Sequence, residues 1–219
     1  MTILSASLLG GLLALDATAV GQFMVSRPLA AGLLAGWLAG DSVAGFLVGV
    51  VLEIYLLVAF PVGGARFPEG ATGTVVAAVT AATNPGPGSL ALGVALGLVW
   101  GQLGGWTISG MRTLNSYIAP DPAAPEVRSA TVVTGHLLAL LLDFVRGAVV
   151  TGTGVWFGQN AVTRLGGNWP LEQADTMGLL LVGAAVSLGI LLRSFGGFAR
   201  RRVLFLAGLA AGIAGGLLL

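Results

Sequence analysis

The sequence contains no cysteine, no lysine and a single histidine, and only 9% of its 219 residues are charged. Without cysteine there can be no disulfide, thiolate nucleophile or thiolate metal ligand, and one histidine excludes a multi-histidine metal site. The ten basic residues, all Arg, nearly balance nine acidic ones, so the basic footprint of a nucleic-acid-binding protein is missing. We therefore expect no metal, no cofactor and no nucleic-acid partner.

Motifs of intramembrane and ATP-dependent enzymes are also missing. An aspartyl protease of this kind needs G-x-G-D, whereas the chain has Leu38-Ala39-Gly40-Asp41. A rhomboid-type serine protease needs a G-x-S-G-like element, and Ser109 follows Thr107-Ile108 instead. No Walker A loop is present. The sequence thus offers no catalytic residue.

Hydrophobic residues make up 56% of the chain, the mean hydropathy is +0.94, and 36 residues are glycine. This composition excludes an ordinary soluble globule and indicates a multi-spanning membrane protein. We predict an all-α integral membrane protein, a polytopic helical bundle with re-entrant hairpin elements, that forms one membrane domain over residues 1–219.

Residues 90–219 are expected to contribute the transmembrane helices. The predicted spans are Leu90–Met111, Thr131–Gly158, Met177–Leu192 and Val203–Leu219. The proline-containing stretch Asn115–Arg128 and the polar stretch Gln159–Asp175 are expected to form loops. Arg112 and Arg128 flank the first loop, and Arg193 and Arg200–Arg202 lie between the last two spans, which places both segments in the cytoplasm by the positive-inside rule.

Residues 1–84 form the hairpin-rich half that we expect to bind substrate. The apolar pieces are Ile3–Met24, Pro28–Ala39, Ser42–Phe60 and Ala71–Ala82, several of them too short to cross about 30 Å of hydrocarbon. Gly40-Asp41 joins two of these pieces and predicts a re-entrant hairpin. Transporters build substrate sites from such broken elements.

Glycines recur four residues apart in three runs: Gly32, Gly36, Gly40; Gly93, Gly97, Gly101; and Gly208, Gly212, Gly216. This spacing puts each run on one helix face, where close helix packing is the expected role. A smooth sliding surface is the alternative.

Polar residues inside apolar runs are costly, about 2.5 to 3.5 kcal/mol for a charge at the bilayer centre, and therefore indicate function or pairing. Glu53 is the sharpest candidate, because it lies in Val50-Val51-Leu52-Glu53-Ile54-Tyr55. Its carboxylate is suited to accept hydrogen bonds from the hydroxyls of a sugar. An ion pair with Arg27 or Arg66 is the alternative.

Three further polar residues are candidates, and two of them, Arg27 and Glu69, each have two interpretations. Arg27, just before Pro28 at a helix start, would either anchor that helix or contact a ligand. Asp41 fits a turn in which its side chain binds local amides. Glu69, between Pro68 and Gly70, fits either a first-turn charge or a second polar ligand.

Asp143 and Arg146 lie three residues apart, a spacing that allows an ion pair within one helix. His136 lies about two turns earlier, so all three side chains are expected on one face. A self-neutralising pair beside an interfacial histidine is favoured over a proton relay.

These residues resemble the membrane IIC subunit of the mannose/fructose/sorbose family of bacterial phosphotransferase-system (PTS) sugar transporters. The resemblance is carried by Arg27-Pro28-Leu29, Gly40-Asp41, Leu52-Glu53, Gly63 and Pro68-Glu69, and more weakly by His136 and Arg146. The chain departs from the family pattern at Gly21-Gln22, where an acidic pair is common, and at Pro68-Glu69, where the family has P-D.

The resemblance implies a multi-pass subunit of the bacterial cytoplasmic membrane that binds and translocates a hexose-like sugar. It implies a IID membrane partner, trimers of IIC/IID pairs and an elevator-like movement. It also implies soluble IIA and IIB proteins that supply the phosphoryl group, so no phosphoryl-carrying residue is expected in this chain. The implied substrate-site residues are Glu53 as the leading sugar ligand, then Glu69 and Gln22, with Arg27 and Asp41 shaping the site.

Two functions from other classes stay open at this stage. One is a solute-binding membrane subunit of an ATP-driven, vitamin-type importer, which can have this size and hydropathy. The other is a non-transporting membrane scaffold that uses its glycine faces for assembly.

Overall fold

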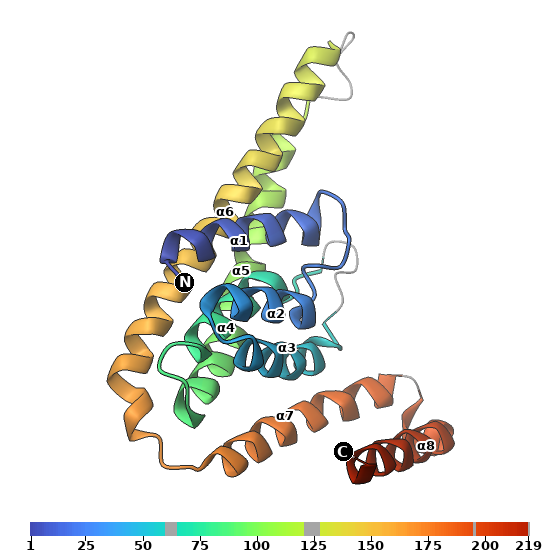
Figure 1. Ribbon diagram of the computed structural model, residues 1–219. Coiled ribbons are helices and arrows are strands. Elements are labelled where there is room, and N and C mark those ends of the chain that lie inside the picture. Colours follow the sequence, from blue (N-terminus) through green and yellow to red (C-terminus); the bar gives the residue numbers. More distant parts are fainter. Residues whose placement is uncertain (60–64, 121–127, 195, 219) are drawn as a thin grey trace.

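The computed structural model describes residues 1–59, 65–120, 128–194 and 196–218, and every regular element in these ranges is helical (Figure 1). The α-helices are α1 (Ile3–Thr18), α2 (Pro28–Ala39), α3 (Ser42–Leu56), α4 (Gly70–Ala81), α5 (Pro87–Ile118), α6 (Ser129–Leu165), α7 (Gln173–Ser194) and α8 (Gly197–Leu218), with a short 3-10 turn, η1 (Gly166–Asn168), after α6. The predicted all-α class is confirmed.

Helices α2 and α3 form the predicted hairpin. Pro28 occupies the start of α2, where its missing N–H costs nothing, and Gly40 ends the helix in the left-handed region with φ 90°. The Asp41 carboxylate then caps α3 by accepting a 2.9 Å hydrogen bond from the Ala44 amide, as the turn interpretation predicts.

Glycine brings the two helices of the hairpin into backbone contact. A Cβ on Gly32 would lie 2.5 Å from the Gly45 carbonyl oxygen, and one on Gly36 would lie 2.6 Å from the Gly45 Cα. Gly93 and Gly97 meet the backbone and side chains of α4 in the same way. The predicted packing role therefore holds for Gly32, Gly36, Gly93 and Gly97. A Cβ on Gly40, which ends α2, or on Gly208 in the third run would meet no described atom within 4 Å.

Helix α4 forms the centre of the molecule. All of its residues from Ala71 to Ala81 are buried, and it packs on α1, α2, α3, α5 and α6. Its small side chains allow this crowding, because Ala, Gly, Thr and Val let several helices approach closely. Two apolar clusters built around Val75 and Val76 on one side and Leu52 and Val94 on the other make up the core.

Helices α5 and α6 are longer than expected. Their 32 and 37 residues correspond to about 48 and 55 Å at 1.5 Å per residue, well beyond a hydrocarbon layer of about 30 Å. Both continue past α1 as a two-helix arm (Figure 1). Consequently the expected loop Asn115–Arg128 is helical up to Ile118, and the expected polar loop Gln159–Asp175 is helical at both ends.

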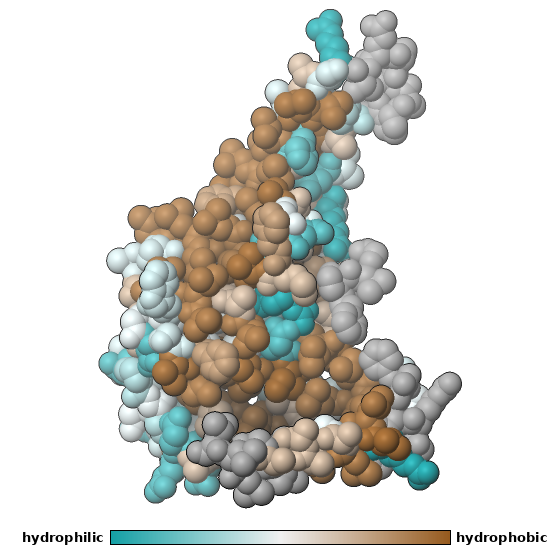
Figure 2. All heavy atoms as spheres, turned by 45° about the vertical axis from the view of Figure 1, so that its right-hand side comes forward, coloured by the Kyte–Doolittle hydropathy of each residue, from teal (hydrophilic) through white to brown (hydrophobic). Residues whose placement is uncertain are grey.

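Three helical segments are long and apolar enough to cross a membrane: Pro87–Ile118, Ser129–Asn168 and Gln173–Ser194. They contain the first three predicted spans. The described part of the fourth, residues 203–218, lies within α8, which contacts only α7 among the described elements. Large apolar side chains such as Leu137, Leu141 and Trp156 are exposed. Figure 2 shows hydrophobic residues over much of one face, as expected for a surface in contact with lipid or with other subunits.

Candidate functional site

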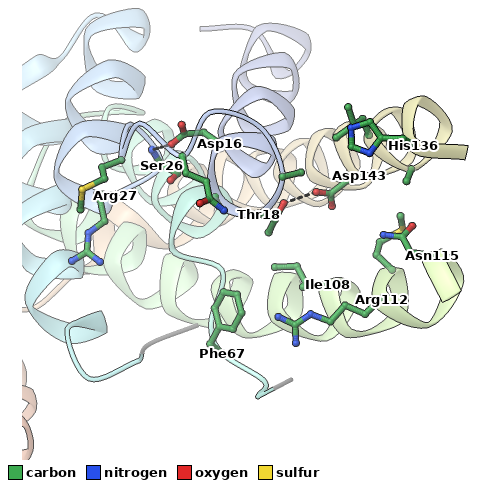
Figure 3. Close-up of a pocket in the computed structure, with 17 residues that line it drawn as sticks. Asp16, Thr18, Ser26, Arg27, Phe67, Ile108, Arg112, Asn115, His136 and Asp143 are labelled. Carbon is green, nitrogen blue, oxygen red and sulfur yellow. Dashed lines mark hydrogen bonds between the residues drawn. The ribbon is translucent and has the colours of Figure 1, made fainter. Parts of the chain in front are cut away.

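A cavity of about 690 Å³ opens between the end of α1, the α1–α2 connection, α5 and α6 (Figure 3). Polar side chains from all four segments line it: Asp16, Thr18, Gln22, Ser26, Arg27, Arg112, Asn115, His136 and Asp143. The predicted site residues Gln22 and Arg27 therefore reach this cavity, whereas Glu53, Glu69 and Asp41 are not part of its lining.

Asp16, near the end of α1, organises the α1–α2 connection. Its buried carboxylate accepts hydrogen bonds from the amides of Phe23, at 2.7 Å, and Ser26, at 2.9 Å. Gln22 and Met24 adopt positive φ angles of 52° and 65°, which non-glycine residues rarely do. Because such strain persists only where surrounding contacts enforce it, Asp16 holds the segment that presents Gln22 and Arg27 to the cavity.

Arg27 is held by Glu53, the residue that the sequence singled out most sharply. An Nη2 proton of Arg27 is donated to Glu53 Oε1, and the Leu29 amide donates to Oε2 at 3.2 Å. The side chains are 41% and 20% exposed, so the pair adds little stability and its main effect is orientation. The ion pair considered for Glu53 is confirmed, with Arg27 as the partner.

Glu69 lies at the start of α4 and is 1% exposed. Arg146 binds both of its oxygens, Nη2 to Oε1 at 2.7 Å and Nη1 to Oε2 at 2.9 Å, and the Thr72 hydroxyl donates to Oε2 at 2.8 Å. Gly104 on α5 makes room for the carboxylate, because a Cβ there would lie 2.5 Å from Oε2. Both carboxylate oxygens of Glu69 therefore accept hydrogen bonds within the protein, and the residue does not line the cavity.

Asp143 connects this buried network to the cavity. Its Oδ1 accepts a 2.7 Å hydrogen bond from Arg146 Nε, which confirms the ion pair predicted within one helix. Its Oδ2 accepts a 2.6 Å hydrogen bond from the Thr18 hydroxyl, drawn in Figure 3. With 12% of its side chain exposed, Asp143 is the one member of the Glu69–Arg146–Asp143 cluster that lines the cavity.

Asp41 lies elsewhere, at the tip of the α2–α3 hairpin. Besides capping α3, it lines a second cavity of about 290 Å³ together with Ala81, Leu90 and Gln173. Gly63, a member of the family pattern, falls outside the described residues.

Arg112 and Asn115 are among the residues of the main cavity that have no predicted site role in the sequence. There Arg112 only adds charge beside an expected loop, and Asn115 belongs to that loop. Both line the cavity because α5 continues through them. No signal in the sequence marks them, because the sequence pattern does not show that α5 continues beyond its expected apolar span.

Among the described residues, no group of three or more His, Cys, Asp or Glu side chains is placed to hold a metal ion. The donors and acceptors that are present, mainly carboxylate, amide, hydroxyl and guanidinium groups, suit a polar organic ligand.

The chain is similar to known proteins in sequence and in fold. Residues 1–199 match the family model described as PTS system sorbose-specific IIC component. A PTS system sorbose-specific EIIC component from Klebsiella pneumoniae is 31% identical over 130 residues, which is 58% of this chain and 48% of that protein, so the match spans about half the length of this relative. A solved structure described as a membrane protein has the same fold, with a TM-score of 0.74 and 20% sequence identity. The match covers 99% of this chain and 91% of the chain in that structure.

The family match covers nearly the whole chain, and together with the apolar helices and the membrane-protein neighbour it establishes a multi-pass membrane protein. This chain belongs to the family of sorbose-specific IIC components of the PTS, within the mannose/fructose/sorbose group.

Proposed function

We propose that this chain is the membrane subunit of a PTS sugar transporter and that the cavity between α1, α5 and α6 binds a hexose-class sugar. The observation that carries the proposal is the cavity itself. Its volume of about 690 Å³ lies within the range of about 300 to 1,000 Å³ typical of small-molecule sites, and polar side chains from several segments line it beside apolar ones. Family membership supports the assignment.

The lining supplies both kinds of hydrogen-bonding group that a sugar needs. Asp16 and Asp143 each have further lone pairs beyond those used within the protein, so they can accept bonds from sugar hydroxyls. Arg27 and Gln22, which also line the cavity, can donate to hydroxyl or ring oxygens. Charge-assisted bonds of this kind are stronger than neutral ones and fix the orientation of a ligand.

Residues outside the lining take supporting roles in this proposal. Glu53 sets the position of Arg27, and Glu69 fixes Arg146 and through it Asp143. Direct contact of sugar with Glu53, Glu69 or Asp41 stays a prediction, and it would require a conformation in which these carboxylates exchange their present partners.

The same assignment carries the proposed partners. A IID membrane subunit, soluble IIA and IIB proteins and a trimer of IIC/IID pairs would couple uptake to phosphorylation of the sugar. The exposed apolar surfaces of α6 and α7 offer ample area for a membrane partner. Co-purification with IIA, IIB and IID proteins is the expected outcome, whereas recovery with ATPase subunits would favour the ATP-driven importer considered above.

Uptake of labelled sorbose, fructose and mannose tests the function in cells that carry the partner subunits but no other transporter for these sugars. We expect accumulation that depends on this chain and falls at least tenfold in an Arg27→Gln variant. Arg164→Gln is the matched control, since Arg164 is exposed at the far end of α6. Full uptake in Arg27→Gln, or no uptake of any of these sugars, would contradict the proposal.

A further inference from the structure

Residues 65–69, just before α4, have no helical structure but lie directly against α5. The Glu69 amide donates a 2.8 Å hydrogen bond to the Gly101 carbonyl. A Cβ on Gly105 would overlap the Phe67 carbonyl oxygen, so only glycine at that position lets the two backbones approach this closely. The segment is therefore fixed on α5 at its C-terminal end.

Arg112 fixes the N-terminal end of the same segment. Its guanidinium donates a 3.2 Å hydrogen bond to the Ala65 carbonyl and lies over the Phe67 ring, 5.7 Å from the ring centre. A guanidinium within about 6 Å of an aromatic face is attracted by the electrons of the ring. Figure 3 shows the Phe67 ring beside the Arg112 guanidinium. The position of Phe67 is thus set by contacts on both sides of it in the sequence.

Phe67 is the only phenylalanine, tyrosine or tryptophan among the described residues that line the main cavity. Its side chain is half-buried, and Arg112 covers one face of the ring. Within the described ranges, no second aromatic ring and no second cation lies against it. The cavity therefore has one flat apolar surface among its polar groups, as small-molecule sites commonly do.

A cyclic sugar presents two kinds of surface to a protein. Its hydroxyls project from the edge of the ring and form hydrogen bonds, for which Asp16 and Asp143 supply acceptors. The C–H groups form an apolar face that these carboxylates do not match. An aromatic ring does match it, through dispersion contacts and the attraction of its negative face for polarised C–H groups. We propose that Phe67 is the surface on which the sugar ring stacks and that Arg112 is the positioning residue that holds Phe67 in place.

This inference rests on the proposed function and names the substrate class that the same cavity selects. A hexose in its ring form has a fixed apolar face, whereas an open-chain hexitol carries similar hydroxyls without one. Because Phe67 is already oriented before the sugar arrives, stacking costs little conformational entropy. The cavity should therefore favour cyclic hexoses over hexitols, and this preference should depend on Phe67.

Calorimetric titration of the purified full chain in phosphatidylcholine nanodiscs tests the stacking role. The probes are fructose, mannose and the open-chain hexitol mannitol. We expect Phe67→Leu, which keeps an apolar side chain, to weaken binding of at least one cyclic sugar about tenfold and to change mannitol binding less than about twofold. Phe67→Tyr keeps the ring and should bind the cyclic sugars within about threefold of the wild type.

Phe46→Leu is the matched control, because Phe46 is exposed on α3 and does not line the main cavity. It should bind every probe as the wild type does. Unchanged binding of fructose and mannose in Phe67→Leu, or equal losses for cyclic sugars and mannitol, would overturn the inference alone. A wild-type chain that binds neither cyclic sugar would contradict the proposed function together with the inference.

A Phe67→Trp variant reports contact directly and does not depend on how well Phe67→Leu folds. A tryptophan on which the sugar stacks should change its fluorescence in a saturable way when mannose or fructose is added. The signal is compared with that of the wild type, which contains five tryptophans. A sugar that binds this variant without any additional change in fluorescence would overturn the stacking role.

A double-mutant cycle tests the role of Arg112, because a positioning residue acts only through the ring that it holds. Arg112→Gln should weaken binding of the cyclic sugars about threefold when Phe67 is present and should have almost no further effect in Phe67→Leu. Equal fold-losses in the two backgrounds would show that Arg112 acts independently of Phe67 and would overturn its positioning role.

Discussion

Arg146 and Glu69, 77 positions apart in the sequence, are joined by two nearly parallel hydrogen bonds of 2.7 and 2.9 Å between guanidinium and carboxylate. This pair links α6 to the start of α4, and Asp143 extends it to the cavity wall. Such a buried pair contributes little net stability when intact, but removing one partner leaves an uncompensated charge.

Replacing Arg146 with Met should therefore lower the stability of the protein by about 3 to 5 kcal/mol, because Glu69 would stay buried without its partner. Glu69→Gln should cost less, since Arg146 keeps Asp143 and an amide oxygen remains to accept a bond. Thermal unfolding of the purified protein in detergent measures both. An Arg146→Met variant as stable as the wild type would contradict the structural role of the pair.

Gly104→Ala should disturb the same network from the side of α5. Its new Cβ would lie 2.5 Å from Glu69 Oε2 and 2.9 Å from Glu69 Cβ, which forces a shift costing about 1 to 3 kcal/mol. Gly110→Ala on the same helix meets no described atom within 4 Å and should be neutral or slightly stabilising. The prediction fails if the two variants have the same melting temperature.

Asp16→Asn should loosen the α1–α2 connection. One amide-accepting oxygen is replaced by an NH2 group, so the bond to either Phe23 or Ser26 is lost at a cost of about 1 to 3 kcal/mol. We expect faster hydrogen exchange over residues 20–26 and a higher KM for sugar uptake. Asp175→Asn, at an exposed position in α7, is the control and should change neither quantity.

Glu53→Gln should raise the KM of uptake more than it lowers the stability of the protein. The partly exposed pair with Arg27 adds about 0 to 1 kcal/mol to folding, but it fixes the direction of a guanidinium that lines the cavity. Uptake assays and thermal unfolding are compared on the same preparations. Unchanged uptake would remove Glu53 from both the direct and the supporting role.

Local features of the fold were predictable from the sequence. Pro28, Gly40 and Asp41 set the bounds of the α2–α3 hairpin because their effects on backbone geometry do not depend on distant residues. The ends of α5 and α6 were not predictable in this way. Asn115 and Gln159 are polar, and the sequence pattern cannot distinguish a polar loop from the polar part of a helix that continues beyond its apolar span.

The candidate site was only partly predictable, because its key contacts join distant segments. The polar residues Gln22, Arg27, Glu53 and Glu69 stood out against apolar neighbours, and Arg27 was one of two candidate partners for Glu53. The bonds between Glu69 and Arg146 were not predictable, since no periodicity relates positions 77 residues apart. Arg112 and Asn115 reach the cavity only through the length and packing of α5.

The complete burial of α4 has a consequence for how the protein responds to its surroundings. A helix whose residues from Ala71 to Ala81 touch only protein has no contact with acyl chains. A change in the length of the lipid acyl chains would create hydrophobic mismatch at the outer helices, which carry exposed leucines and tryptophan. Glu69, at the start of α4, would keep the same neighbours, so we expect its hydrogen bonds to Arg146 to be unaffected by changes in lipid composition.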